Sequence, residues 1–289
     1  MNKQDNNQLK LLVALVVLFI YSKNLSAQII SDIAPLGSRS SSLGSSYVSL
    51  TDFWSSLNNP ANIAATTNTY QVGVYYENSY LIKELNLSSI AVCYTNKYLA
   101  LGGYLSRYGI SSYNQGDAAI LLGKNISSNI RIGAKIIYHY YQVANGDLSA
   151  GGFTGEVGIS AKLSKHFLVG VHAINPTQEH IGNETKDQLP AALVIGCSYL
   201  SPWGIDIFGD IKKRISDDLS FHIGIEWLIY QRFAIRTGYQ NSPNQFSLGI
   251  GYKAKSIEVD LSLTKHPTLG YSPQIATSLW FTTKKHPQP

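Results

Sequence analysis

The sequence predicts an all-β fold, an antiparallel transmembrane β-barrel of about 14 strands with an N-terminal hatch segment. Three observations predict it. From Thr69 onward, apolar and polar residues alternate with a period of two, as strands with two differently solvated faces do. The alternation falls into an even number of segments of about ten residues each, a length that crosses a bilayer at a tilt. Charged residues make up only 14% of the chain, while Gly and Tyr are abundant.

The clearest alternating segment lies near the C-terminus, where Val259 and Leu261 alternate with Glu258 and Asp260. A soluble β-sandwich would alternate in the same way, so the number and length of the segments decide in favour of the barrel. We assign the apolar set to the lipid-facing wall and the polar set to the lumen. The predicted strands are residues 69–77, 83–95, 97–106, 113–123, 129–142, 150–163, 166–175, 190–200, 203–212, 218–230, 232–240, 246–253, 256–265 and 273–283.

The connections between these segments alternate between short and long. Transmembrane barrels place short turns on the periplasmic side and longer loops outside. Tight turns are predicted at residues 96–97, 164–165, 201–202, 231 and 254–255, and longer loops at residues 107–112, 143–149, 176–189, 213–217, 241–245 and 266–272. Aromatic residues near the segment ends predict interface girdles, namely Trp203, Trp227, Phe233, Tyr252, Trp280 and Phe281.

The first residues have the features of an export signal. Lys3 and Lys10 form a basic start, residues 11–21 are an apolar run too short to span a bilayer as a helix, and Ala27 ends a small-residue cleavage site. A retained membrane anchor is the alternative. We therefore divide the chain into a signal peptide (1–27), a hatch or plug (28–67), a transmembrane barrel (68–284) and a C-terminal tail (285–289), and predict export to the outer membrane of a Gram-negative bacterium.

The hatch segment starts rich in Ser and Gly, which suits an exposed linker. It also carries many large apolar residues, among them Leu43, Phe53, Trp54 and Leu57, which are too many for a solvated linker. A barrel of about 14 strands has a lumen wider than its own side chains can fill. The segment is therefore predicted to fold as a compact plug inside the barrel.

This segment resembles the N-terminal hatch of the FadL-like outer-membrane proteins, in particular the PorV/PorQ-type members of bacteria with type IX secretion. Those proteins open with Gly-x-Arg-x-x-x-x-Gly, then an acidic residue, then Asn-Pro-Ala. This sequence departs from the pattern at Ser45, where a second Gly is common, and in having one Asp where a pair is common. The resemblance covers residues 37–65, and the matching residues are Gly37, Arg39, Gly44, Asp52, Asn59, Pro60 and Ala61.

The resemblance implies two functions. The first is an accessory component of type IX secretion that binds partner or cargo proteins. The alternative is a FadL-like channel for the uptake of small hydrophobic molecules. The longest predicted loop, residues 176–189, is mostly polar and would make a poor capture site for an apolar ligand, which favours the first. The expected partners are outer-membrane lipid, secretion-system proteins or cargo, and a small hydrophobic ligand. A formal net charge of +5 is too mild and dispersed for nucleic acid.

The inward register of the predicted strands carries charges of both signs. They form either a structural polar lining, as barrel interiors have, or a selectivity ring that contacts a substrate. We expect Arg39 and Asp52 of the hatch to pair with inward charges such as Glu226, Asp210 or Arg236. The lumen-facing polar residues are Glu77, Arg131, Lys135, Glu156, Asp206, Asp210, His222, Glu226, Arg236, Glu258 and Asp260.

The sequence contains no motif that indicates catalysis or cofactor binding. Asp206, Asp210, His222 and Glu226 lie on adjacent predicted strands, but they lack the spacing of a metal-ligand motif. There is no Gly-x-Ser-x-Gly nucleophile elbow. We therefore predict no enzyme activity, no cofactor and no metal. The two cysteines, Cys93 and Cys197, fall on strands far apart around the wall, so we expect free thiols.

Overall fold

The fold was analysed in a computed structural model that describes residues 34–65, 69–143, 148–182, 187–215 and 218–282. The predicted signal peptide (1–27), the first residues of the predicted hatch (28–33) and the predicted tail (285–289) lie outside the described residues. Within the described ranges, no helix is long and apolar enough to cross a membrane.

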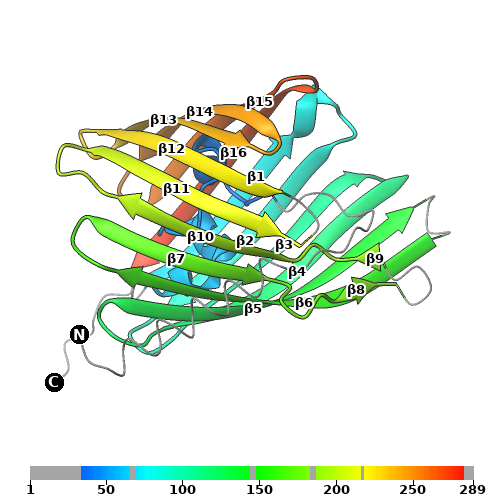
Figure 1. The fold of residues 1–289 in the computed structure, drawn as a ribbon, viewed down its shortest axis with the longest axis horizontal. Coiled ribbons are helices and arrows are strands. Elements are labelled where there is room, and N and C mark those ends of the chain that lie inside the picture. Colours follow the sequence, from blue (N-terminus) through cyan, green and yellow to red (C-terminus); the bar gives the residue numbers. More distant parts are fainter. Residues whose placement is uncertain (1–33, 66–68, 144–147, 183–186, 216–217, 283–289) are drawn as a thin grey trace.

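Fourteen strands of the described residues close into one antiparallel barrel (Figure 1). Each strand pairs with its neighbours in sequence, β7 pairs with β10, and β1 closes the barrel on β16. This confirms the predicted fold class, and each predicted segment has its strand. The strands are β1 (Thr69–Asn78), β2 (Asn86–Thr95), β3 (Ala100–Ile110), β4 (Tyr113–Asn125), β5 (Ile130–Val143), β6 (Leu148–Lys162), β7 (Phe167–Ile174), β10 (Ala192–Tyr199), β11 (Ile205–Arg214), β12 (Leu219–Ile229), β13 (Phe233–Asn241), β14 (Asn244–Lys253), β15 (Ile257–His266) and β16 (Gly270–Thr282).

The two faces of the wall follow the predicted alternation. On β12, Ile223, Ile225 and Trp227 are exposed on the outside, whereas His222 and Glu226 are buried on the inside. The same division holds on β15, where Leu261 is exposed and Asp260 is buried. The outer face is thus a continuous apolar surface, as a lipid-facing wall requires.

The predicted loop lengths are largely wrong, because several strands continue into the predicted loops. Strand β3 runs to Ile110, which pairs with Tyr113 across residues 111–112, and β13 and β14 are joined by residues 242–243. At Gly109 the backbone has φ +94, a conformation that glycine adopts at little cost. The longer connections are residues 79–85, with the 3₁₀ helix η2 (Ser79–Leu81), and residues 175–191, with the small hairpin β8 (His180–Ile181) and β9 (Asp187–Gln188).

Residues 34–65 lie inside the barrel as a plug (blue in Figure 1). They form two short helices, α2 (Ser38–Ser42) and α3 (Phe53–Asn58), followed by the 3₁₀ helix η1 (Pro60–Ala65). Helix α3 begins at Asp52, whose carboxylate accepts a hydrogen bond from the Ser55 amide at 3.1 Å, as an N-cap does. We call residues 34–65 the hatch.

The hatch and the wall share the apolar core. In the largest cluster, Phe53, Trp54, Leu57 and Ile63 of the hatch pack against inward side chains of β1 to β5, including Tyr104. Two smaller clusters join Tyr47 and Val48 to β7 and β10, and Leu43 and Leu50 to Phe208 of β11. Burial of these side chains removes them from water, so the lumen supplies the dry environment that the hatch needs.

Candidate functional site

Inward glycines let the hatch backbone approach the wall. A Cβ atom added to Gly133 on β5 would lie 2.6 Å from the Ala61 amide nitrogen, and would also overlap the Pro60 carbonyl. A Cβ atom on Gly170 of β7 would lie 2.5 Å from the Val48 carbonyl oxygen. These separations are shorter than a van der Waals contact, so the glycines relieve crowding beside the hatch, as glycine in a strand often does.

The Asn-Pro-Ala motif holds the hatch together from within. Asn59 donates from Nδ2 to the Val48 carbonyl at 2.9 Å, and its Oδ1 accepts from the Ala61 amide at 3.2 Å. Pro60 begins η1, a position where its missing N–H costs nothing. Asn59 thus joins the two halves of the hatch. The first motif glycine, Gly37, has φ +104, and a Cβ atom there would collide with the Trp54 side chain.

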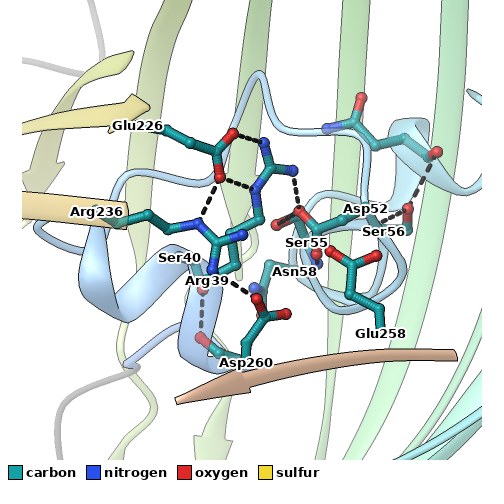
Figure 2. A network of polar contacts seen from close by, with 12 residues as sticks. Arg39, Ser40, Asp52, Ser55, Ser56, Asn58, Glu226, Arg236, Glu258 and Asp260 are labelled. Atoms are coloured by element: carbon teal, nitrogen blue, oxygen red, sulfur yellow. Dashed lines mark hydrogen bonds and ion pairs between the residues drawn. The ribbon is translucent and has the colours of Figure 1, made fainter. Parts of the chain in front are cut away.

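Arg39 connects the hatch to the wall through a charged network (Figure 2). Its guanidinium donates two hydrogen bonds to Glu226 of β12, at 2.6 and 3.0 Å, and one to Asp52 at 3.1 Å. Glu226 also accepts from Arg236 of β13, and Arg236 donates to Asp260 of β15 at 2.5 Å. Bidentate pairing of this kind is strong and directional. Burial by itself lowers the pKa of Arg39, but Glu226 and Asp52 raise it well above its usual value.

Other wall side chains bond to the hatch backbone. Asp210 of β11 accepts from the amides of Tyr47 and Val48, at 2.7 and 3.0 Å. Lys135 of β5 donates to the Leu57 carbonyl at 3.0 Å. His222 of β12 lies 2.7 Å from the Gly44 carbonyl through Nδ1, and because a carbonyl only accepts, this nitrogen carries the proton. The wall therefore holds the hatch from several sides.

A second polar cluster lies beside the hatch on β5, β6 and β7. Glu156 bonds to Lys135 at 2.6 Å and to Nε2 of His172 at 2.8 Å, and Nδ1 of His172 is 2.9 Å from the Tyr47 hydroxyl. All four side chains are buried. Because every charge has an opposite partner, the cluster avoids the cost of an isolated buried charge.

A third cluster lies on β4, β5 and β6. His139 is 2.7 Å from Asp117 through Nδ1 and 2.8 Å from the Thr154 hydroxyl through Nε2. Asp117, Thr154 and Tyr47 are polar site residues that were not predicted from the sequence. The period-two alternation within residues 113–123 places Asp117 on the inward face, so Asp117 could have been predicted as a lumen residue. No local sequence pattern predicts that the Tyr47 hydroxyl meets a wall histidine.

The structure places the remaining predicted site residues outside these clusters. Glu77 accepts from the Tyr75 hydroxyl at 2.7 Å, Asp206 accepts from the Ser201 amide at 2.8 Å, and Glu258 pairs with Lys253 at 3.2 Å. Arg131 is half-buried on β5. The expected pairing of Asp52 with a wall charge is corrected, because Asp52 faces Arg39 and caps α3 within the hatch.

The four residues that were weighed and rejected as metal ligands, Asp206, Asp210, His222 and Glu226, have other bonding partners. Asp210 bonds the hatch amides and Glu226 bonds two arginines. In the part of the chain that the structure describes, no group of three His, Cys, Asp or Glu side chains is placed to hold a metal ion. Both cysteines are free thiols, as predicted, with Cys93 buried and Cys197 exposed.

A cavity of about 640 Å³ lies in the lumen above the hatch. Its floor includes Leu36 and Tyr47 of the hatch, and its rim includes Tyr80 and Pro243 at the end of the barrel that carries connections 79–85 and 175–191. We call this cavity the chamber. Its lining is mixed. Leu87, Tyr104, Tyr108 and Ile137 of β2, β3 and β5 give apolar and aromatic surface, and Asp117, Lys135 and His139 of β4 and β5 lie among them. The lining from β11, β12 and β13 is polar and includes Lys212, Ser220, His222 and Gln240.

The fold was compared with those of known proteins. No protein-family model and no curated protein sequence matches the chain. Among solved structures, the CymD monoaromatic hydrocarbon channel has a TM-score of 0.67 at 13% identity, over 89% of this chain and 100% of that chain. The toluene transporter TodX of Pseudomonas putida has a TM-score of 0.67 at 13% identity, over 88% of this chain and 100% of that chain.

A FadL homologue of Pseudomonas aeruginosa is also similar, with a TM-score of 0.61 at 10% identity, over 89% of this chain and 100% of that chain. At such identities the likeness shows the fold alone. The chain therefore has the fold of these FadL-like channels, over their whole length. The finer resemblance to PorV/PorQ-type proteins gains no support from these comparisons.

Proposed function

We propose that this protein is an outer-membrane channel that takes up a small hydrophobic molecule. The observation that carries the proposal is the chamber of about 640 Å³ between the open end of a closed barrel and the hatch. Its volume suits a small ligand. The solved structures of similar fold include a monoaromatic hydrocarbon channel and a toluene transporter, which supports the same function.

The chamber lining indicates the kind of molecule. Tyr104, Tyr108 and Ile137 offer an apolar and aromatic surface, and His139, His222 and Gln240 offer hydrogen-bonding groups around it. Apolar surface binds the body of a ligand, and a few polar groups fix its orientation. The ligand is therefore a small, largely apolar molecule that carries at least one polar group.

Passage beyond the chamber requires the hatch to shift, because its side chains fill the lumen below. The Arg39 network holds the hatch to β12 through ion pairs, and the Glu226 carboxylate in this network is fully buried. Separating such a pair leaves a buried charge without a partner, which is strongly destabilising. Separating Phe53, Trp54 and Leu57 from β1 to β5 would also expose large apolar surfaces. A shift of the hatch therefore has to exchange these contacts for others.

A binding assay tests the proposal with N-phenyl-1-naphthylamine, an apolar probe with one amine, added to the purified barrel in detergent and in vesicles. Leu87 lines the chamber, whereas Ile90 on the same strand is exposed on the outer wall. We expect Leu87→Trp to weaken probe binding about tenfold, because the indole fills the chamber, and Ile90→Trp to leave it unchanged. Equal binding by both variants would overturn the proposal.

The accessory role in type IX secretion stays a prediction from the hatch motif. Arg39, Asn59 and Gly37 each have a structural part in the hatch, through the Glu226 ion pair, the Val48 hydrogen bond and the Trp54 packing. Any hatch of this build needs these contacts, so the motif does not separate a secretion component from a channel. Co-purification from gently solubilised outer membranes would separate them, because an accessory would retain partner proteins and a lone channel would not.

A further inference from the structure

One end of the barrel carries a ring of positive charge. At this end, where Thr69 pairs with Thr282, the turns are residues 96–99, 126–129, 163–166, 200–204, 230–232 and 254–256. None of these turns contains Asp or Glu. Seven exposed cations lie in these turns or within two residues of them, and we call this set the basic rim: Lys97, Lys124, Lys162, Lys165, Arg232, Lys253 and Lys255.

The connections at the opposite end carry charges of both signs. Among their described residues are Glu84, Glu179, Asp187 and Asp218, against Lys83, with Arg214 and Lys265 beside them. At the basic rim itself, the carboxylate of Glu258 pairs with Lys253 at 3.2 Å, and the Lys253 side chain is 56% exposed. An exposed pair of this kind contributes little, so the rim keeps its positive field. Only the rim combines exposed cations with turns that contain no carboxylate, so it is the end that suits a negatively charged partner.

The basic rim coincides with aromatic side chains. The Nζ atom of Lys97 is 4.6 Å from the centre of the Tyr98 ring, and that of Lys253 is 5.2 Å from the centre of a Trp280 ring. Trp203 and Tyr230 in the turns of this end are 80% and 91% exposed. Aromatic residues of transmembrane barrels lie at the level of the lipid headgroups, so the cations lie at that level too.

We propose that the basic rim binds the phosphate groups of anionic phospholipids in the membrane leaflet at its end of the barrel. The proposal rests on the proposed function for its membrane setting. The two longest connections, residues 79–85 and 175–191, lie at the opposite end, which places the rim on the periplasmic side. The distribution of the cations favours lipid over a protein. They lie at the β2–β3, β4–β5, β6–β7, β12–β13 and β14–β15 turns, which surround the barrel, whereas a docking protein would need them gathered on one side.

The test uses the protein's own tryptophans. Trp203, Trp227 and Trp280 lie near the basic rim, and Trp54 is buried in the hatch. The full chain is placed in phosphatidylcholine vesicles with increasing amounts of brominated phosphatidylglycerol, whose bromine quenches nearby tryptophan. Each Lys or Arg near an anionic surface contributes about 1 kcal/mol, so we expect phosphatidylglycerol to bind about fivefold more tightly than brominated phosphatidylcholine, and less so in high salt.

Matched variants show whether the preference for phosphatidylglycerol comes from the basic rim. Substitution of three rim cations together, Lys97→Gln, Arg232→Gln and Lys255→Gln, is expected to abolish the preference. Substitution of three exposed cations of the other end, Lys83→Gln, Arg107→Gln and Lys265→Gln, is expected to preserve it. Quenching by both lipids without a preference, or a preference that survives in the rim variant, would overturn the proposal while leaving the channel function standing. Absence of quenching by either lipid would instead contradict the membrane setting on which both rest.

Discussion

At the residue scale, the hatch depends on positions where the wall has no side chain. Gly133 faces the Pro60–Ala61 peptide, while on the neighbouring strand nothing lies within 4 Å of a Cβ atom built on Gly155. Both glycines lie in strands of the same wall. A side chain at position 133 would collide with the hatch, whereas a side chain at position 155 would collide with nothing. A strand glycine that faces a hatch backbone is a packing requirement, and one that faces open space is not.

We predict that Gly133→Val displaces the hatch and that Gly155→Val does not. The valine side chain at position 133 would overlap the hatch backbone, and overpacking of this kind costs about 1–3 kcal/mol. Single-channel recordings in planar bilayers measure the result as ion conductance, which should rise for Gly133→Val alone. Identical conductance of the two variants would contradict the assigned packing.

At the element scale, each strand turns one face outward to the lipid and the other inward to the hatch or the chamber. On β15, Leu261 is exposed on the outer wall near the middle of the strand, and Glu258 is half-buried on the inner face near one end. The alternation of β15 is regular because its pairing with β14 and β16 contains no bulge. Substitutions on opposite faces of the strand therefore enter different surroundings, lipid on the outside and the lumen on the inside.

We predict that Leu261→Arg destabilises the folded barrel by about 2–4 kcal/mol, because the outer wall near the membrane midplane excludes a charge. Glu258→Gln should be far milder, because Glu258 forms its ion pair with the exposed Lys253. Denaturant unfolding in lipid vesicles, followed by tryptophan fluorescence, gives both free energies of unfolding. Similar values for the two variants would show that the register or the environment of β15 is wrongly assigned.

At the scale of the whole molecule, the barrel and the hatch complete one another. The closed wall leaves no unpaired strand edge, which lipid could not satisfy. The hatch fills the lumen that closure leaves, and it is held by apolar clusters and by side chains of β5, β11 and β12. The wall alone should therefore remain a barrel, but an open one.

We predict that deletion of residues 37–62 yields an assembled barrel that conducts ions and admits large antibiotics, while the parent does not. Closed barrels resist unfolding in detergent until heated, so heat-modifiable migration on gels shows whether the variant has assembled. Conductance and antibiotic sensitivity then measure the opening. An assembled deletion variant that is as impermeable as the parent would mean that something other than the hatch closes the lumen.

The sequence by itself determined the elements of this protein, and the tertiary structure decided how they meet. Period-two alternation predicts strands and their faces because each strand carries its own pattern, and β15 shows it without reference to its neighbours. The partner of Arg39 could be narrowed only to several inward charges, since Glu226 is 187 residues away in sequence. Loop lengths also depended on tertiary pairing, because β3 continues to Ile110 only where Tyr113 of β4 meets it.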